Sequence, residues 1–511
     1  MQPDSVKKIL IANRGEIAVR VMRACREMGL STVAVFSECD RAALHVRYAD
    51  QAYGIGSSPP RDSYLNIERV LAAARHAGAD AVHPGYGFLS ENEDFAAAVR
   101  DAGLTFIGPT PKAIALMGSK TAARAAAARA GVPIVPGSSA PFAPEASDDE
   151  MARSAAALGF PVLVKAVAGG GGKGMRTVTD AADFLGAVRA ARSEAGTAFG
   201  DSAVYLERRL LRPRHVEVQV LADEHGTVLP FVERECSIQR RHQKVVEETP
   251  SLAVSPAVRR AMTSAAASVA RQVGYTNAGT IEFLLDENGD FFFLEMNTRL
   301  QVEHPITEMV TGVDLVHWQI RVARGERLTL DPESVLVPRG HAIECRIYAE
   351  DPDNQFLPSP GRLLDLRLPS GPGLRNDAGV AGGQDVPIFY DPMISKLIAW
   401  AEDRPHAIAR MRRALSEFVV AGIKTTVPFF SWLLAEPSFV AGDFHTGSLD
   451  QILSTQNGRP FVDPPVSAQE VASVALALSA VLSPDAALPV GGPVTGAAGW
   501  RARARAEGLR S

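Results

Sequence analysis

The chain has 511 residues, of which 46% are hydrophobic and 22% are charged, and its formal net charge is −5. This length exceeds what one hydrophobic core supports and predicts about three or four domains. The charge balance argues against a nucleic-acid partner, and no apolar run reaches the roughly 20 residues that a membrane-spanning helix requires.

The cysteines and the N-terminus indicate a cytoplasmic protein. The four cysteines, Cys25, Cys39, Cys236 and Cys345, are scattered without CxxC spacing, which is typical of reduced thiols. The N-terminal residues lack the apolar h-region of a signal peptide and lead directly into a strand. Cys236 lies in a charged segment; a plain buried thiol is the stronger interpretation, and a reactive one is the alternative.

The first 92 residues predict a parallel α/β sheet. Residues 7–12 form a strand, a helix follows as far as Gly29, and residues 31–37 form a second strand. Another helix and strand follow over residues 66–92. Loops at the carboxyl ends of parallel strands bind ligands, so Tyr86 and its neighbouring glycines are candidates for a site. A purely structural turn explains these glycines equally well.

The next segment predicts a helix and a glycine-rich flap. Residues 117–130 form one Ala-rich helix with Lys120 near its start. Lys165 lies within the strand at 161–168, where a buried lysine needs an anionic partner. The glycines of residues 169–174 precede a strand rather than a helix, so they fail as a dinucleotide fingerprint, and they lack the Walker A pattern. A flap over a nucleotide is favoured, with a plain flexible hairpin as the alternative.

Two further segments contain polar residues that could serve a site or a solvated surface. Strands are predicted at 203–208 and 215–221, separated by a break at Pro213. The backbone of residues 205–210 is suited to contact an adenine edge. Residues 233–251 are densely basic around His242 and Lys244, which taken alone is typical of a charged surface loop. A long amphipathic helix over residues 254–274 follows.

The strongest local signal lies at residues 281–303, IEFLLDENGDFFFLEMNTRLQVE. Asn288-Gly289 between two apolar runs predicts a hairpin with a two-residue turn, which places Glu282 directly opposite Glu295. Opposed Cβ atoms lie roughly 4.5–5.5 Å apart, so these carboxylates repel unless a cation lies between them.

Alternation along an extended chain then predicts that one face carries Glu295, Asn297, Arg299, Gln301 and Glu303. Carboxylates suit Mg²⁺, the Arg fork suits a planar oxyanion, and Glu303 suits a base. A solvated strand face is the alternative. With the basic segment at 233–251, these acids supply both charges for an anionic substrate and its metal.

The remaining segments predict α+β structure to about residue 450. Residues 304–326 form one helix that ends at Gly325, and residues 339–352 form a strand that carries Arg346. A strand at 390–400 and a helix at 406–420 follow. Residues 466–482 predict one helix, and the Gly, Ala and Pro content of residues 485–511 is typical of a linker or a loosely ordered tail.

Taken together, these segments resemble the biotin carboxylase family of ATP-grasp ligases. The resemblance covers about residues 5–450 and rests on long ordered motifs: IANRGEIAVRVMRACRE, HPGYGFLSEN, KAVAGGGGKGMR, RHVEVQVLAD, RRHQKVVEE, EMNTRLQVEHPITE, ECRIYAEDP and YDPMISKLI. It implies an α/β and α+β protein with an ATP-grasp fold. The implied domains are an N-terminal Rossmann-like α/β domain (1–119), an ATP-grasp domain (120–322, lid about 137–206), a C-terminal α+β domain (323–454) and a linker-like extension (455–511).

The resemblance also implies roles for matching residues. ATP would be held by Lys120, Lys165, Gly171 and Gly172 of the lid, Glu207, Arg208 and Leu210 of the connector, His215 and His242. Mg²⁺ or Mn²⁺ would be held by Glu282, Glu295 and Asn297. Bicarbonate would be held by Lys244, Arg299, Gln301 and the Val302 backbone and deprotonated by Glu303. Arg346 would stabilise the biotin enolate, Tyr86 would lie near the biotin ring, and Arg20 would lie at a homodimer interface.

Two positions depart from the usual family pattern. Ala168 shortens the glycine run, and Arg208 replaces a common lysine in the connector. Because the connector contacts adenine mainly through its backbone, we expect little effect from Arg208 and a slightly stiffer lid from Ala168.

The implied reaction phosphorylates bicarbonate with ATP to give carboxyphosphate, which releases CO₂ beside biotin inside a closed lid. The released phosphate would take the biotin proton. Because no Met-Lys-Met tripeptide occurs in the sequence, we expect biotin on a separate carboxyl carrier protein, with a carboxyltransferase partner choosing the final acceptor. This would be the first half-reaction of an acyl-CoA carboxylase, as in fatty acid biosynthesis. The alternatives are another ATP-grasp ligase, acting on an amino acid or carbamate, and a non-catalytic scaffold of a carboxylase complex.

Overall fold

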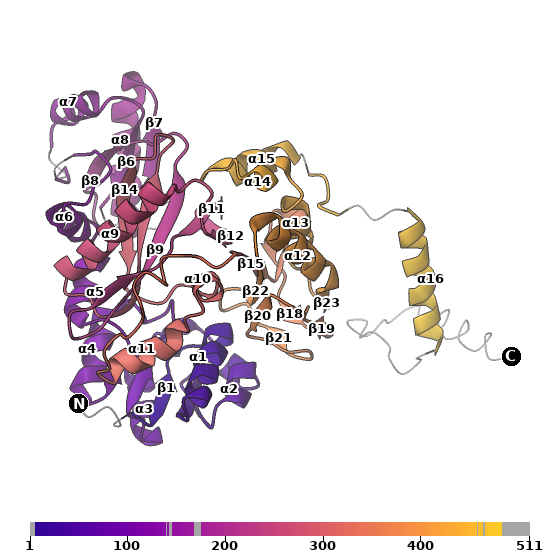
Figure 1. The fold of residues 1–511 in the computed structure, drawn as a ribbon. Helices are drawn as coiled ribbons and strands as arrows, with labels where there is room; N and C mark the ends of the chain where they lie inside the picture. The colour runs from indigo at the N-terminus through magenta and orange to yellow at the C-terminus, as the bar shows by residue number, and fades with distance from the viewer. Residues whose placement is uncertain are drawn as a thin grey trace. The chain divides into compact units, whose positions relative to one another are not determined.

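The computed structural model of the chain describes residues 6–138, 140–142, 146–167, 175–456, 458–462 and 466–482. The chain divides into two compact units, Met1–Phe461 and Val462–Ser511 (Figure 1). The expected glycine flap, with Gly171 and Gly172, lies outside the described residues. In the second unit, helix α16 (Val466–Leu482) confirms the helix expected there.

The N-terminal region is the parallel α/β sheet that the sequence predicts. Its strand order is β3-β2-β1-β4-β5, and every pairing is parallel. The strands are β1 (Lys8–Ile11), β2 (Ser31–Phe36), β3 (Gln51–Gly54), β4 (Ala81–His83) and β5 (Thr105–Phe106). The intervening helices are α1 (Gly15–Glu27), α2 (Leu44–Tyr48), α3 (Ile67–Ala77) and α4 (Glu93–Asp101). Two apolar clusters, one built around Ile9 and the other around Leu10, pack on opposite sides of β1.

The expected single helix over 117–130 is wrong. The chain forms α5 (Pro111–Gly118) and then α6 (Lys120–Arg129). Ser119 between them is extended, and its side chain accepts a hydrogen bond from the amide of Ala122, which caps α6. Lys120 is therefore the first residue of a helix.

A small antiparallel sheet, β7-β6-β8, follows and carries the lysine strand. Its strands are β6 (Val162–Ala166), β7 (Met175–Val178) and β8 (Val204–Arg208), packed with α7 (Asp148–Leu158) and α8 (Phe184–Phe199). The strand expected after the glycines is confirmed by β7.

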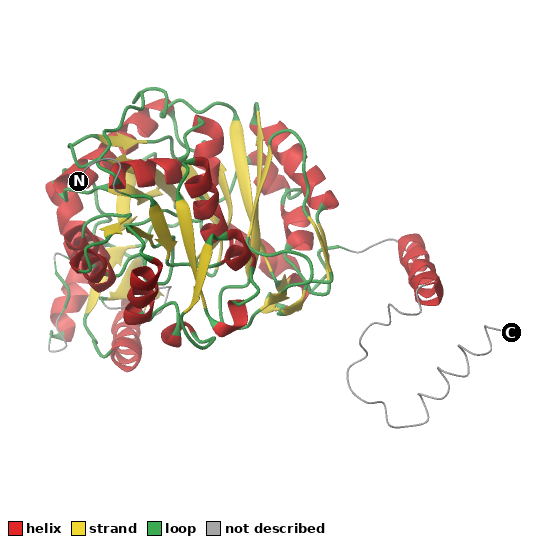
Figure 2. Cartoon of the chain, turned by 90° about the horizontal axis from the view of Figure 1, so that it is seen from below, coloured by secondary structure: helices red, strands yellow, loops and turns green. Residues whose placement is uncertain are grey.

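The largest sheet runs through the middle of the first unit, with helices against its strands (Figure 2). Its order is β14-β13-β9-β11-β12-β15-β22-β20, with β10 paired to β9, and the pairings are antiparallel. The strands are β9 (Arg214–Ala222), β10 (Val228–Pro230), β11 (Arg234–Arg240), β12 (Gln243–Thr249), β13 (Asn277–Leu285), β14 (Phe291–Asn297), β15 (His341–Tyr348), β20 (Leu374–Ala378) and β22 (Met393–Ala401).

Residues 234–249 are a hairpin rather than the charged loop that their composition favours. Strands β11 and β12 are joined at Arg241 and His242, whose φ values of 49° and 67° are both positive, as a tight hairpin turn requires. Only this turn and its immediate neighbours are exposed. The charged side chains along the two strands are therefore buried and must find partners.

Residues 304–326 form two helices where the sequence predicted one. Helix α10 (His304–Thr311) ends at Gly312, which has a φ of 73°, and α11 (Leu315–Ala323) begins after Asp314. Asp314 caps α11 by accepting from the amide of His317 at 2.7 Å.

Helix α9, four C-terminal helices and several short strands complete the first unit. They are α9 (Pro256–Gln272), α12 (Arg404–Glu417), α13 (Val427–Leu433), α14 (Pro437–Ala441), α15 (Ser448–Gln456), β16 (Glu350–Asp351), β17 (Leu357–Pro358), β18 (Gly361–Arg362), β19 (Asp365–Arg367), β21 (Asp385–Val386) and β23 (Val419–Ala421). Four 3₁₀ turns lie at η1 (Glu38–Asp40), η2 (Pro60–Asp62), η3 (Ala181–Asp183) and η4 (Pro352–Asn354). Among the described residues, no helix combines the length and apolarity needed to span a membrane.

Candidate active site

The hairpin of β13 and β14 places Glu282 directly opposite Glu295, as the sequence predicts. The expected two-residue turn is nevertheless wrong. The amide of Asp286 bonds to the carbonyl of Asp290, so the turn consists of residues 287–289, with Gly289 at a φ of 85°. The register then shifts between Glu282 and Phe283, because Leu294 is an extra residue on β14. The longer turn and the bulge cancel, and the two glutamates pair.

Lys244 forms the centre of the site. From β12 its ammonium reaches Glu217 at 2.5 Å, Glu303 at 2.7 Å and Glu282 at 2.8 Å. Desolvation alone would lower the pKa of Lys244, but these three carboxylates outweigh it and raise the pKa well above its usual value. Lys244 is therefore a fixed cation rather than a proton donor.

Arg234 supports this centre from behind. Its side chain is fully buried and donates to Glu217 at 2.6 Å and to Gln301 at 2.7 Å. It also donates to Gln219, Thr280 and Thr307, each at 3.0 Å. With these partners the guanidinium has the compensation that a buried charge requires, and it fixes the amide of Gln301.

The expected alternation from Glu295 to Glu303 does not hold. Strand β14 ends at Asn297, and residues 298–303 form bends and a turn that leads into α10. The side chains converge all the same. The amides of Asn297 and Gln301 donate to Glu282 Oε1 at 2.8 Å and 2.7 Å, and Arg299 donates to Asn297 Oδ1 at 3.0 Å. Arg299 also pairs with Glu91 at 3.0 Å.

Glu303 lies between two cations. It contacts Lys244 at 2.7 Å through one oxygen and Arg346 at 2.9 Å through the other. Desolvation would raise the pKa of Glu303, but Lys244, Arg346 and Arg234 hold it well below its usual value. Glu303 is thus ionised, and an anion that draws charge from Lys244 or Arg346 would make it a stronger base.

Arg346 is shared with a second carboxylate. Its Nε donates to Glu247 at 2.6 Å. Burial raises the pKa of Glu247 to about 7 despite this contact. Glu247 is therefore only partly ionised near neutral pH, and Arg346 keeps positive charge for Glu303 and the space beside it.

That space is a pocket of about 600 Å³, within the range typical of small-molecule sites. Arg299, Val302, Arg346, Tyr86 and Glu16 are among the residues that line it. The hydroxyl of Tyr86 donates to Glu16. Tyr86 thus lines the pocket, and its role in a site stays a prediction. Gly85 and Gly87 beside it have positive φ values of 64° and 65°, which a structural turn also requires.

Several nucleotide candidates lie on the small sheet, with Lys165 on β6 and Glu207 and Arg208 on β8. Lys165 pairs with Glu207, which supplies the anionic partner expected for it, and Arg124 contacts the same carboxylate at 2.5 Å. Desolvation lowers the pKa of Lys120, an effect that Glu295 opposes and Lys165 reinforces. Lys120 therefore shares an electrostatic environment with both the lysine strand and the hairpin.

The other connector residues are more open. The amide of Arg208 donates to the carbonyl of Pro136 at 2.8 Å, while its side chain is exposed and Leu210 is half-buried. His242 is exposed at the tip of the β11–β12 turn. His215, by contrast, is buried and contacts Glu282 at 2.9 Å, and this carboxylate outweighs desolvation and raises the pKa of His215.

The paired glutamates fit a divalent cation. Desolvation raises the pKa of Glu295, and the negative charge of Glu282 raises it further. A metal ion between the two carboxylates would remove this repulsion. Mg²⁺ takes one or two carboxylates and completes its shell with phosphate oxygens and water, so Glu282, Glu295 and Asn297 suffice. The neighbouring set of His215, Glu217 and Glu282 also brings donor atoms together, but Lys244 already supplies its positive charge.

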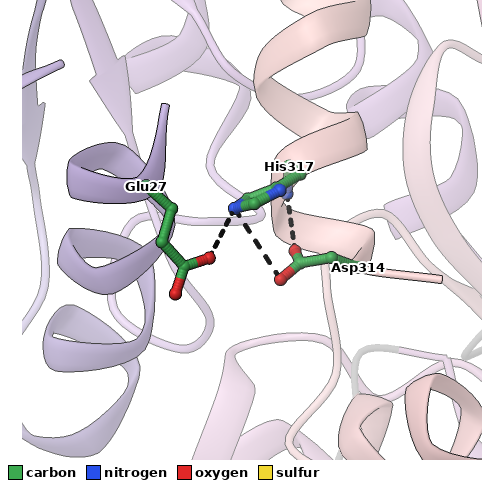
Figure 3. A group of neighbouring side chains, drawn as sticks. All are labelled: Glu27, Asp314 and His317. Carbon is green, nitrogen blue, oxygen red and sulfur yellow. Dashed lines mark hydrogen bonds and ion pairs between the residues drawn. The ribbon is translucent and has the colours of Figure 1, made fainter. Parts of the chain in front are cut away.

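A separate group of possible ligands lies at the junction of α1 and α11 (Figure 3). His317 Nε2 lies 3.0 Å from Glu27 and 3.9 Å from Asp314. Asp314 is also engaged by Arg20 at 2.8 Å. Ion pairs and the helix cap account for all three side chains, and we assign no metal to them.

Several residues of the site were not predicted from the sequence. Arg124, Glu217 and Arg234 each hold a candidate residue in place, as described above. Lys396 is fully buried, donates to the carbonyl of Val302 at 2.8 Å and pairs with Glu16 at 3.1 Å. The available signal was the one used for Lys165, a charged side chain within an apolar strand, which applies equally to Lys396 in MISKLIAW.

Three models of known protein families match this chain. Family models match residues 5–114 (biotin carboxylase, N-terminal domain), 119–331 (carbamoyl-phosphate synthase L chain, ATP-binding domain) and 344–451 (biotin carboxylase C-terminal domain). Biotin carboxylase of Nostoc is 52% identical over 87% of this chain and 99% of its own length. A pyruvate carboxylase subunit of Methanothermobacter thermautotrophicus is 52% identical, over 87% and 89% respectively.

Solved structures give the same result. A biotin carboxylase–β,γ-ATP complex from Campylobacter jejuni has a TM-score of 0.83 at 46% identity and covers 87% of this chain and 99% of its own. The biotin carboxylase domain dimer of 2-oxoglutarate carboxylase from Hydrogenobacter thermophilus, solved with MgADP, ADP and bicarbonate, has a TM-score of 0.84 at 45% identity and covers 90% and 100%. The fold and the site thus define an ATP-dependent ligase, and the expected fold class is confirmed. The chain belongs to the biotin carboxylase family.

Proposed function

We propose that this enzyme transfers a carboxyl group from bicarbonate to biotin on a separate carrier protein, by way of carboxyphosphate. The observation that carries this proposal is the position of Glu303, held between Lys244 and Arg346 at 2.7 Å and 2.9 Å beside a pocket of about 600 Å³. A small planar oxyanion fits the forked donors of Arg299 and Gln301 next to this base.

In the first step a bicarbonate oxygen attacks the γ-phosphorus of ATP, ADP leaves, and Glu303 takes the bicarbonate proton. Bicarbonate entering beside Lys244 and Arg299 draws their positive charge from Glu303 and so raises its basicity. Lys120 and Lys165 offset charge on the transferring phosphoryl group. Mg²⁺ or Mn²⁺ at Glu282, Glu295 and Asn297 would supply further charge neutralisation.

In the second step carboxyphosphate breaks down to CO₂ and phosphate beside biotin. Phosphate takes the proton from the ureido nitrogen, and that nitrogen attacks CO₂. Arg346 at the pocket wall stabilises the enolate-like biotin anion, and Tyr86 lies against the ring. For the adenine side we propose the connector at Glu207, Arg208 and Leu210, with His215 and His242.

The wider assignments are also proposals. The domains are residues 1–119, 120–322 and 323–454, with a linker-like extension at 455–511. We propose a biotin carboxyl carrier protein and a carboxyltransferase as partners, which the likeness to the biotin carboxylase of Nostoc supports. We place the reaction in an acyl-CoA carboxylase of the cytoplasm; the resemblance to a pyruvate carboxylase component makes a keto acid the competing final acceptor.

We further propose a homodimer, which the dimeric relative from Hydrogenobacter supports. Arg20 is buried within its own chain, where it forms ion pairs with Glu308 at 3.0 Å and Asp314 at 2.8 Å. Its role at the interface would therefore be to hold the α1–α11 surface in shape.

The test is the rate of ATP hydrolysis with and without bicarbonate and free biotin. We expect hydrolysis to require bicarbonate and to rise when biotin is added. Stimulation by an amino acid or carbamate in place of biotin would assign another ATP-grasp reaction, and no turnover under any condition would support a scaffold.

A further inference from the structure

The mouth of the 600 Å³ pocket carries an apolar rim. Leu65 and Phe389 line the pocket and are still 43% and 41% exposed, and Ile388 beside Phe389 is 74% exposed. They come from two distant parts of the chain, the turn after η2 and the bend after β21. The deep wall of the same pocket contains Arg299, Val302 and Arg346, so the rim and the proposed reaction centre face one cavity.

The rim is held rigidly. The hydroxyl of Tyr390, next to Phe389, donates to the carbonyl of Ser58 at 2.5 Å and lies within hydrogen-bond distance of Ser37 Oγ at 2.6 Å. Its ring contacts Tyr64 edge-on at 5.4 Å, and the guanidinium of Arg14 stacks on it at 4.3 Å. These contacts tie the C-terminal segment at 387–391 to N-terminal loops and leave the polar groups partnered inside the chain.

A pre-ordered, outward-facing apolar group is costly to leave in water and loses little entropy when covered. Scattered exposed aliphatic residues are ordinary, but Leu65 and Phe389 line one ligand cavity, and Ile388 is the exposed sequence neighbour of Phe389. A ligand delivered on a tether brings the surface of its carrier to that entrance. The rim is thus the part of this chain that a carrier must approach while biotin reaches Arg346.

We propose that Leu65, Ile388 and Phe389 form a docking rim for the protein domain that carries biotin on a lysine, with an apolar patch of that domain beside the modified lysine as its complement. This inference rests on the proposed function and deepens it. It separates recognition of the carrier, at the rim, from recognition of the biotin ring, at the deep wall.

The test compares two substrates in the full-length enzyme, free biotin and an enzymatically biotinylated carrier domain. Ile388→Asp places a charge at the rim without touching the pocket lining, and Val337→Asp is the matched control, a valine that is 62% exposed and does not line the pocket. We expect Ile388→Asp to raise the KM for the carrier about tenfold, the effect of losing one well-packed apolar contact. Its kinetics with free biotin, and both activities of Val337→Asp, should match the unaltered enzyme.

A second variant guards against a local effect of one residue. Leu65→Asp, from the opposite segment, should also raise the KM for the carrier. Unchanged carrier kinetics in both variants would overturn the rim, and so would an equal change for free biotin and carrier. A shift in oligomeric state, measured by light scattering, would instead assign the rim to contact between two copies and also overturn the proposal. If the unaltered enzyme carboxylates neither substrate, the proposed function itself fails, which is a different result from the loss of carrier selectivity.

Discussion

Lys244 offers the sharpest test of how the site is held together. Replacing it in Lys244→Gln removes the cation shared by Glu217, Glu282 and Glu303 and leaves three carboxylates converging in a buried space. Removing one partner from a buried ion pair costs about 3–5 kcal/mol, and we expect a loss of this size at pH 7. Urea-unfolding midpoints of the two proteins measure it.

The penalty should depend on pH in a defined direction. In the native enzyme the pKa values of Glu282 and Glu303 are held well below 4.5, so their stabilising contribution is present at pH 5–7 and is lost only at lower pH. Without Lys244 these pKa values rise, and protonation at pH 5 relieves the repulsion. Each carboxylate whose pKa exceeds the working pH recovers about 1.4 kcal/mol per pH unit.

The variant should therefore be closer to the native enzyme at pH 5 than at pH 7. Lys424→Gln, at an exposed lysine, is the matched control and should change stability by less than about 0.5 kcal/mol at either pH. An equal penalty at pH 5 and pH 7 would refute the reasoning, because it would show that Glu282 and Glu303 do not depend on Lys244 for their ionisation.

Three further outcomes follow from the hairpin and the turn after it. Glu303→Gln should lower bicarbonate-dependent ATP hydrolysis about 10²–10⁴-fold while nucleotide binding, followed by calorimetry, persists; near-normal turnover would remove Glu303 as the base. Glu295→Gln should raise the Mg²⁺ concentration for half-maximal hydrolysis at least about tenfold, and an unchanged Mg²⁺ titration would exclude Glu295 as a ligand. Gly289→Ala should lower stability by about 1 kcal/mol because its φ is 85°, although the nearest atom to an added Cβ is 3.8 Å away. The control Gly186→Ala, in a helix with open space around it, should be neutral or slightly stabilising, and equal melting temperatures for both would contradict the strain argument.

The opposition of Glu282 and Glu295 was predicted correctly, but by two errors that cancel. Asn-Gly favours a two-residue turn, whereas the turn takes residues 287–289 because Asp286 accepts from the amides of Asn288 and Asp290, each at 2.9 Å. The bulge at Leu294 then restores the register. Turn propensity is local, whereas a bulge depends on how two strands pair, so the sequence signals only the first.

The breaks within helices were the main local failure. Gly118-Ser119 and Gly312 with Asp314 each carry a stop signal followed by a cap, but the apolar periodicity on both sides runs through them. Such signals end a helix only when the following helix must change direction in order to pack. That requirement comes from tertiary structure.

The positioning residues were the main failure at the site. Alternation in HVEVQVL places Glu217 and Gln219 on a polar face, but it does not reveal that Arg234 covers that face and that both residues are buried. Residues that act on a substrate lie in long motifs that a family resemblance transfers. Residues that hold them lie on strands far apart in sequence, and only the sheet brings β9, β11 and β12 together.

The most direct measurement is the fate of isotopically labelled bicarbonate incubated with the enzyme, Mg²⁺, ATP and free biotin. Mass spectrometry should detect labelled carboxybiotin that forms only with ATP and disappears in Glu303→Gln. ATP hydrolysis without label on biotin, or label on a different acceptor, would contradict the account of Glu303, Lys244 and Arg346 as the centre of a biotin-carboxylating site.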